Sequence, residues 1–163
     1  MSEQISEKRP FFVYGTLLPN QPNFFLWDYA ITQMTKALIY DCQLYDMGPY
    51  PMMIEEQGGR TVGMVMHVAD EFVDNVTNHL DTLEGYDPDR PETSAYQRAL
   101  RMIQMENGRF VKAWVYLGAK KFVQDYPKIE SGDWQQHMQV KQGQIVDWWE
   151  TIETVAGLHQ SEE

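Results

Sequence analysis

An Asn107-Gly108 pair between two apolar runs is the sequence feature that most constrains the fold. Asn-Gly adopts the positive backbone angles of a tight turn with little strain, and such turns join neighbouring antiparallel strands. The flanking segments 96–105 and 110–117 are expected to be strands, and the second of them is rich in β-branched and aromatic residues, which favours an extended chain. The second run is nearly all apolar, so we expect protein to cover both of its faces. The sequence therefore predicts an antiparallel hairpin in the second half of the chain.

The first half of the chain also contains apolar segments that are bounded by turn residues. Gly48-Pro49-Tyr50-Pro51 predicts a rigid turn, and Gly58-Gly59 predicts a hairpin reversal. Between these signals we expect strands at 10–14, 34–46, 52–54 and 61–68.

Two segments have the period of a helix. Apolar residues recur at helical spacing over 70–84, and Gly85 is a typical helix stop. A second helix is expected to open at Asp133, because Gln136 three residues later completes an approximate capping box. The apolar positions of the first helix are Phe72, Val73, Val76, Leu80 and Leu83.

These elements amount to six or seven strands and two helices, joined mostly by hairpins. This pattern predicts the α+β class, with an antiparallel or mixed sheet that closes into a small barrel with flanking helices. We expect a mobile leader over 1–9, one domain over 10–132 and a helical extension over 133–163. In that extension, Trp148 and Trp149 are expected to pack on the domain or on a second copy, which would make a homodimer.

Charge and cysteine content bound the function. The chain has 13 basic and 24 acidic residues, a net charge of −11. Nucleic acid and anionic membranes are therefore unexpected partners, because both attract basic surfaces. No apolar run reaches a membrane span or resembles a signal core, and the single cysteine, Cys42, cannot form an internal disulfide. We expect a cytoplasmic protein, and the spacing of its four histidines suggests no metal site.

Glu84 is the first candidate for chemistry. At 100° per residue it lies about 20° from Val73 and about 40° from Leu80 around the helix, so it falls on the apolar stripe. It also lies in the last turn, where the helix dipole disfavours negative charge. Both effects raise the pKa of its carboxyl, whereas Asp81 is expected to be solvated. The alternatives are a Glu84 side chain that points into water or pairs with Arg98 or Arg101.

The second candidate is the segment Tyr14-Gly15-Thr16-Leu17, at the end of the first strand. Glycine permits a close approach of ligand or backbone, and successive backbone N–H groups can form a concavity that binds anions. The alternative is an ordinary turn at the end of a strand.

Taken together, these residues resemble the gamma-glutamylcyclotransferase-like, or AIG2-like, family. The resemblance is carried by the YGTL segment, the LDTLEGY segment from Leu80 to Tyr86, the later Tyr96-Gln97-Arg98 and the segment from Ser131 to Trp134. It covers roughly residues 11–134.

The resemblance implies a small barrel with a ligand cavity, no cofactor, and conversion of a γ-glutamyl amine or γ-glutamyl amino acid into 5-oxoproline and the free amine. Glu84 would be the catalytic acid/base. Departing from expectation, the segment 18–23 that follows YGTL has no basic residue. We expect the substrate contacts to come from Tyr14, Gly15, Thr16, Leu17, Tyr86, Tyr96, Arg98 and Tyr116.

Two other functions are compatible with the same residues. The cavity could hold a small acidic metabolite without turnover, since fold does not imply function. Alternatively, the chain could be an interaction domain whose aromatic side chains fill the cavity. The aromatic residues available for that role are Tyr14, Tyr86, Tyr96, Trp114 and Tyr116.

Overall fold

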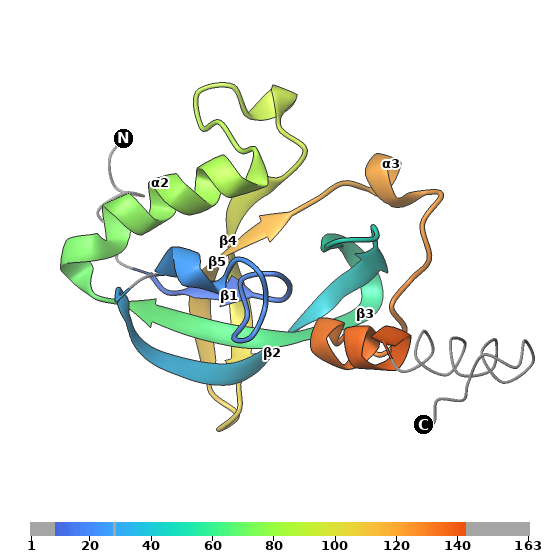
Figure 1. The fold of residues 1–163 in the computed structure, drawn as a ribbon, viewed down its shortest axis with the longest axis horizontal. Coiled ribbons are helices and arrows are strands. Elements are labelled where there is room, and N and C mark those ends of the chain that lie inside the picture. Colours follow the sequence, from blue (N-terminus) through green and yellow to red (C-terminus); the bar gives the residue numbers. More distant parts are fainter. Residues whose placement is uncertain (1–8, 28, 143–163) are drawn as a thin grey trace, which may run out of the picture.

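The computed structural model describes residues 9–27 and 29–142. Within them, five strands form a closed barrel in the order β1-β3-β2-β4-β5 (Figure 1). All neighbours pair antiparallel except β1 and β5, which close the barrel through a parallel bridge between Phe11 and Trp114. The expected α+β class and small mixed barrel are confirmed. The strands are β1 (Phe11–Val13), β2 (Ile31–Asp46), β3 (Pro51–Val68), β4 (Gln97–Met105) and β5 (Phe110–Leu117).

Two of the predicted reversals are confirmed. The Asn107-Gly108 turn joins β4 to β5, and the Gly108 backbone has a φ of 89°. The turn 48–50 joins β2 to β3, where the Met47 N–H donates to the carbonyl of Tyr50 over 3.0 Å. β5 is buried from Ala113 to Leu117, as its apolar run predicted.

The hairpin predicted at Gly58-Gly59 is wrong. Segments 52–54 and 61–68 belong to one strand, β3, which pairs with β2 along almost its whole length. The glycines instead form a wide bulge, because residues 56–59 all lie opposite Asp41 alone. Asp41 has a φ of 60° and its carboxylate accepts a hydrogen bond from the Gly58 N–H. Glycine is needed here because it tolerates the strained backbone of the bulge, and not because the chain reverses. The described residues therefore contain five strands, not six or seven.

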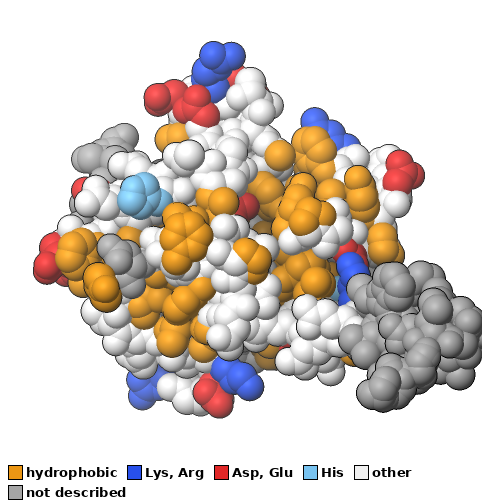
Figure 2. Space-filling model, viewed as in Figure 1, with side chains coloured by type: hydrophobic (Ala, Val, Ile, Leu, Met, Phe, Trp, Pro, Cys, Tyr) orange, Lys and Arg blue, Asp and Glu red, His pale blue; other side chains and the backbone are white. Residues whose placement is uncertain are grey.

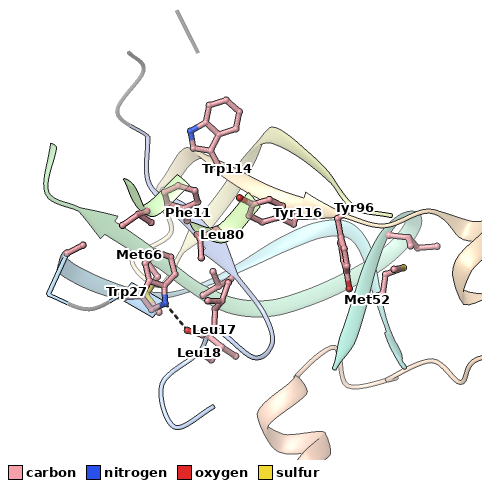
Figure 3. Close-up of a cluster of buried hydrophobic side chains, with 14 of the residues drawn as sticks. Phe11, Leu17, Leu18, Trp27, Met52, Met66, Leu80, Tyr96, Trp114 and Tyr116 are labelled. Carbon is pink, nitrogen blue, oxygen red and sulfur yellow. Dashed lines mark hydrogen bonds between the residues drawn. The ribbon is translucent and has the colours of Figure 1, made fainter. Parts of the chain in front are cut away.

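Helix α2 (Val73–Glu84), entered through the 3-10 turn η2 (Asp70–Phe72), packs against one side of the barrel (Figure 1). Its Val76 and Leu80 join a buried cluster that includes Phe11, Met66 and Trp114 (Figure 3). Gly85 ends the helix as predicted: its φ is 70°, and the following Tyr86 N–H donates to the Asp81 carbonyl. The C-terminus of α2 is thus fixed against the barrel.

Three short helical turns and one further helix complete the described chain. The turns are η1 (Phe24–Trp27), η3 (Pro91–Thr93) and α3 (Lys120–Val123). The helix begins at residue 134 and is described to residue 142. The Asp133 carboxylate caps it by accepting from the Gln136 N–H over 3.1 Å, as expected.

The predictions for the chain ends fall largely outside the described residues. Trp148, Trp149 and the rest of 143–163 are not described, and neither are residues 1–8 of the expected leader. The boundary at residue 132, the packing of the extension and the homodimer therefore stay predictions. Within the described residues, no helix has both the length and the hydropathy to cross a bilayer.

Candidate active site

A cavity of about 580 Å³ lies where four segments meet beside the barrel. Its lining includes the chain after β1, from Tyr14 to Leu17, and the end of α2, from Leu83 to Gly85. The turn 49–51 before β3 and the side chains of Tyr96 and Tyr116 complete it. Figure 2 shows hydrophobic side chains on both sides of a hollow in this region of the surface. The cavity therefore brings together the two segments that the sequence singled out.

The chain after β1 is packed tightly into its position. A Cβ atom on Gly15 would lie 2.7 Å from Cγ of Pro51, so glycine is needed for the proline ring to pack against this part of the chain. Within the described residues, the backbone N–H groups of Gly15, Thr16 and Leu17 donate to no protein acceptor. These donors lie on the cavity wall, where an anionic group could accept from them.

Side chains from the next turn of the chain and from the helix at 134–142 hold this loop. The Asn23 amide donates to the Thr16 hydroxyl over 2.9 Å, and the Trp27 indole N–H donates to the Leu17 carbonyl over 2.9 Å (Figure 3). From the helix at 134–142, Trp134 donates to the Gln21 side chain and Gln135 to a loop carbonyl. The loop geometry is therefore preformed, which lowers the entropic cost of ligand binding.

Glu84 also lines the cavity, at the end of α2. Among the described residues, its carboxylate has neither a hydrogen bond nor an ion pair, because Arg98 pairs with Asp81 and Arg101 with Glu55. Desolvation by the surrounding protein, and to a smaller extent the negative charge of Asp81, raises the pKa of Glu84 to about 7. The direction of this shift is the one the helical position predicted, and it leaves both protonation states populated at neutral pH.

The expectation that Asp81 is solvated is wrong. Its side chain is buried and binds Arg98 through two contacts, from Nε at 2.9 Å and Nη2 at 3.3 Å. The Tyr116 hydroxyl donates to the same carboxylate over 2.5 Å. The Arg98 guanidinium in turn lies over the rings of Trp114 and Tyr86, at 4.7 and 5.4 Å from their centroids. Strands β4 and β5 thus bury Asp81 by bringing up partners that its place on the helix could not reveal.

Of the four tyrosines that line the cavity, Tyr14, Tyr96 and Tyr116 have hydroxyls that are already engaged. Tyr14 donates to the backbone carbonyl of Tyr116 over 2.7 Å, and Tyr96 donates to the carbonyl of Pro51 over 3.2 Å. Burial is the main cause that raises the pKa of all three, with Glu84 adding to the shift. At neutral pH these three tyrosines are therefore uncharged, whereas the pKa of Glu84, at about 7, lies near neutrality.

The structure brings most of the predicted site residues to one cavity. Glu84 and Tyr14, Gly15, Thr16, Leu17, Tyr96 and Tyr116 line it, whereas Tyr86 and Arg98 are not among the lining residues. Sequence reasoning missed Asn23, Tyr50 and Pro51. Proline and glycine in the turn 48–51 signalled a reversal, but nothing in the sequence placed that reversal beside Gly15.

The alternative of a cavity filled by the protein's own aromatic side chains does not agree with the structure. The available aromatics surround the cavity or lie outside it, and about 580 Å³ remains open. Across the described residues, there is no group of three or more histidine, cysteine or acidic side chains arranged to hold a metal ion.

Comparisons with known proteins agree with this fold. YkqA from Bacillus subtilis superposes with a TM-score of 0.62 at 21% identity over 83% of this chain, which spans 42% of the length of YkqA. An AIG2-like protein from Mus musculus gives a TM-score of 0.57 at 25% identity, covering 75% of this chain and 86% of that one. The protein ytfP from Escherichia coli gives 0.53 at 29% identity, covering 77% and 95%.

The sequence matches a family model but no curated protein. The family model described as "Gamma-glutamyl cyclotransferase, AIG2-like" matches residues 11–136, which include every lining segment of the cavity. The chain belongs to the gamma-glutamyl cyclotransferase, AIG2-like family.

Proposed function

We propose that this chain converts a γ-glutamyl amine or γ-glutamyl amino acid into 5-oxoproline and the free amine. Family membership supports cyclotransferase-type activity in general. The observation that carries the specific proposal is that Glu84, whose carboxyl has no partner among the described residues, lines the same cavity as a loop whose backbone N–H groups have no acceptor there.

Glu84 is the proposed acid and base. A carboxyl with a pKa of about 7 can accept a proton and return it without a large free-energy cost in either direction. An ordinary glutamate with a pKa near 4.5 would hold a proton too weakly to serve as the acid at neutral pH.

The loop after β1 is the proposed anchor for the substrate. The N–H groups of Gly15, Thr16 and Leu17 would donate to the α-carboxylate or to the oxyanion that develops on the γ-carbonyl. These local donors are needed because a net charge of −11 repels an anionic substrate at long range.

The reaction exchanges one amide bond for another within the substrate. The α-amine nitrogen attacks the γ-carbonyl carbon, closing the five-membered lactam, while the bond from that carbon to the leaving nitrogen breaks. Glu84 takes the proton that the attacking nitrogen loses and delivers it to the leaving nitrogen, so no water is consumed. A cavity that holds the substrate folded supplies the proximity of the two groups, which can be worth about 7–11 kcal/mol when alignment is good.

The remaining residues support this chemistry indirectly. Tyr14, Tyr96 and Tyr116 would form the wall that excludes water, and their bonds to backbone or to Asp81 keep the rings in place. We propose that Arg98, stacked near Tyr86, acts by holding Asp81 rather than by touching substrate. Asp81 then supplies part of the negative field that raises the pKa of Glu84.

Release of 5-oxoproline from a panel of γ-glutamyl compounds tests the proposal. The wild-type protein should release it, and Glu84→Gln should reduce turnover by about 10²–10⁴-fold with the fold retained. Glu71→Gln is the matched control, since the same chemical change is made at an exposed carboxylate just before α2. Undiminished release by Glu84→Gln would remove Glu84 from the catalytic role.

The alternative function is a module that binds a small acidic metabolite in the same cavity. It is favoured by the preformed loop, whose donors suffice for binding alone. In that case calorimetry should detect binding of 5-oxoproline or γ-glutamyl compounds, and no compound in the panel should be cleaved.

A further inference from the structure

The helix at 134–142 contacts two segments of the chain that run into the lining of the cavity. On the first segment, Gln135 donates to the carbonyl of Pro19 over 2.8 Å, and the Gln21 side chain accepts from the same helix over 3.1 Å. The next residues of that segment, 22–23, line the cavity. The helix therefore holds one side of the cavity just before its lining begins.

The second segment is the turn between β2 and β3, which the helix holds through one carboxylate (Figure 1). Nε2 of His137 lies 2.7 Å from Oδ2 of Asp46, the last residue of β2, and Nζ of Lys141 lies 3.1 Å from the same oxygen. The other carboxylate oxygen accepts from the Gly48 N–H over 2.8 Å. Residues 49–51 of this turn line the cavity, so the carboxylate joins the helix to a second side of the cavity.

The packing of His137 allows it to fix the turn rather than follow it. Its ring lies against that of Trp134, with 6.0 Å between the centroids, and Trp134 is buried. The Asp46 side chain is only 10% exposed, so water has little access to its oxygens. Hydrogen bonds to a carboxylate are stronger than neutral ones, and a buried acceptor that loses a donor is costly. The position of the helix is therefore transmitted to the turn.

The donors to Asp46 lie outside the region that the family model matches. That region ends at residue 136, whereas His137 and Lys141 follow it in the chain. The contact between the helix and the turn is therefore a feature of this chain that family membership does not supply.

We propose that the helix at 134–142 sets the separation of two sides of the cavity, with His137 as a positioning residue that acts on the turn through Asp46. This inference rests on the proposed function, because it concerns how the substrate of that reaction is held. The turn would contact the substrate in the ground state and in the transition state alike. Its displacement should therefore raise KM and leave kcat nearly unchanged.

The test compares three histidine variants. His137→Phe removes the donor to Asp46 and keeps a ring against Trp134, whereas His137→Gln keeps a side chain that can donate. His79→Phe is the matched control, because it makes the same change at an exposed histidine of α2 that is not among the lining residues. The kcat and KM for 5-oxoproline release are measured with the panel of γ-glutamyl compounds, and the Kd for 5-oxoproline is measured by calorimetry.

In His137→Phe the KM and the Kd for 5-oxoproline should rise by about threefold to tenfold, as one lost hydrogen bond allows, with kcat within about twofold of wild type. His137→Gln and His79→Phe should stay close to wild type in all three constants. Lys141→Met, which removes the longer contact to Asp46, should change KM in the same direction and by less. A purely structural role would lower the stability of His137→Phe and leave KM and Kd unchanged, which would overturn the inference.

Amide hydrogen exchange follows the turn itself and needs no turnover. The Met47 N–H donates to the Tyr50 carbonyl and the Gly48 N–H to Asp46, so both amides report on the order of the turn. Their exchange should be about threefold to tenfold faster in His137→Phe than in wild type, because local opening becomes easier, and unchanged in His79→Phe. A rise in KM without faster exchange at these two amides would also overturn the inference.

Failure of the proposed function has a different signature. If the wild-type protein cleaves none of the γ-glutamyl compounds, the proposed function fails, and the Kd for 5-oxoproline replaces KM as the readout of the cavity. Weaker binding by His137→Phe together with faster exchange of the Gly48 amide would then support the positioning role. Equal binding by His137→Phe and wild type would contradict it.

Discussion

Asp81 and Glu84 lie in the last turn of the same helix and have opposite environments. Asp81 is buried against the barrel and bound by Arg98 and Tyr116. Glu84 faces the cavity, and among the described residues nothing pairs with it. The difference comes from the neighbouring strands, because β4 and β5 supply partners on one side of the helix and the cavity lies on the other.

Within one helical turn, Asp81 therefore has a structural role and Glu84 has the environment of a proton-transfer group. The Asp81 carboxylate, which is paired with Arg98 and Tyr116, fixes the helix to the barrel. A carboxyl that is desolvated and unpaired is destabilised as an anion, which is the condition for proton transfer near neutral pH. The helix therefore holds its catalytic candidate in place by means of its neighbour.

Removing the arginine that pairs with Asp81 should have the largest effect on stability. Arg98→Met leaves Asp81 buried without its cation, and we expect the free energy of unfolding to fall by about 3–5 kcal/mol. Urea denaturation measures this loss. Arg101→Met is the control, because its pair with Glu55 is exposed and should contribute less than about 1 kcal/mol. Equal losses in the two variants would show that Asp81 does not depend on Arg98.

Removing the Glu84 carboxyl, on the cavity side of the helix, should raise the stability of the protein rather than lower it. The pKa of Glu84 is raised from 4.5 to about 7 on folding, so its contribution to stability is lost as the pH rises between those values. Glu84→Gln should therefore be as stable as wild type at pH 4 and more stable at pH 8, by at most about 3 kcal/mol. Thermal or urea unfolding at both pH values measures the difference. A variant that is less stable than wild type at pH 8 would indicate a structural partner for Glu84.

The same titration should govern the activity. Because the proposed general base is the ionised Glu84 carboxylate, kcat/KM should rise with pH through about 7 and then level off until another group titrates. A pH profile between 5 and 9 measures it. An acid limb centred near 4.5 would mean that the group responsible has an ordinary pKa.

A change in the loop that faces Glu84 should have a smaller effect on activity. In Gly15→Ala the new methyl group would contact Pro51 at 2.7 Å, so the loop or the turn before β3 must shift. A displacement of catalytic groups of this kind lowers kcat/KM by about tenfold or more. Gly48→Ala has open space around its Cβ, though its φ of 104° strains the turn, so it controls for backbone strain nearby. A Gly15→Ala variant with unchanged kcat/KM would show that the loop needs no close approach to Pro51.

The smallest effect is expected at the cavity wall. Tyr96→Phe removes one hydrogen bond to the Pro51 carbonyl, which should cost about 1 kcal/mol of stability and little activity. Denaturation and 5-oxoproline release measure both. A loss of activity as large as that of Glu84→Gln would instead make the Tyr96 hydroxyl a participant in the reaction.

The fold could be predicted where turn residues in the sequence join strands that pair with each other in the structure. Asn107-Gly108 and the turn at 48–51 join the strands that the sequence indicated, and Gly85 ends α2 where expected. Gly58-Gly59 misled because a glycine pair serves a bulge as well as a turn, and only pairing with β2 distinguishes the two.

The candidate site, likewise, could be predicted only where it depends on spacing along one element. Helical periodicity is enough to place Glu84 on a buried stripe, since it depends only on spacing along one element. The pairing of Asp81 with Arg98 and the packing of Pro51 on Gly15 depend on contacts between distant segments. No pattern along one element reports such contacts, so these neighbours could not be found from the sequence.

The most direct test of this account is the titration of the Glu84 carboxyl itself. NMR of the protein with ¹³C-labelled glutamate, assigned by comparison with Glu84→Gln, follows the carboxyl carbon from pH 3 to pH 9. We predict a midpoint at about 7. A midpoint near 4.5, the ordinary value for glutamate, would contradict the claim that the cavity keeps this carboxyl poised for proton transfer.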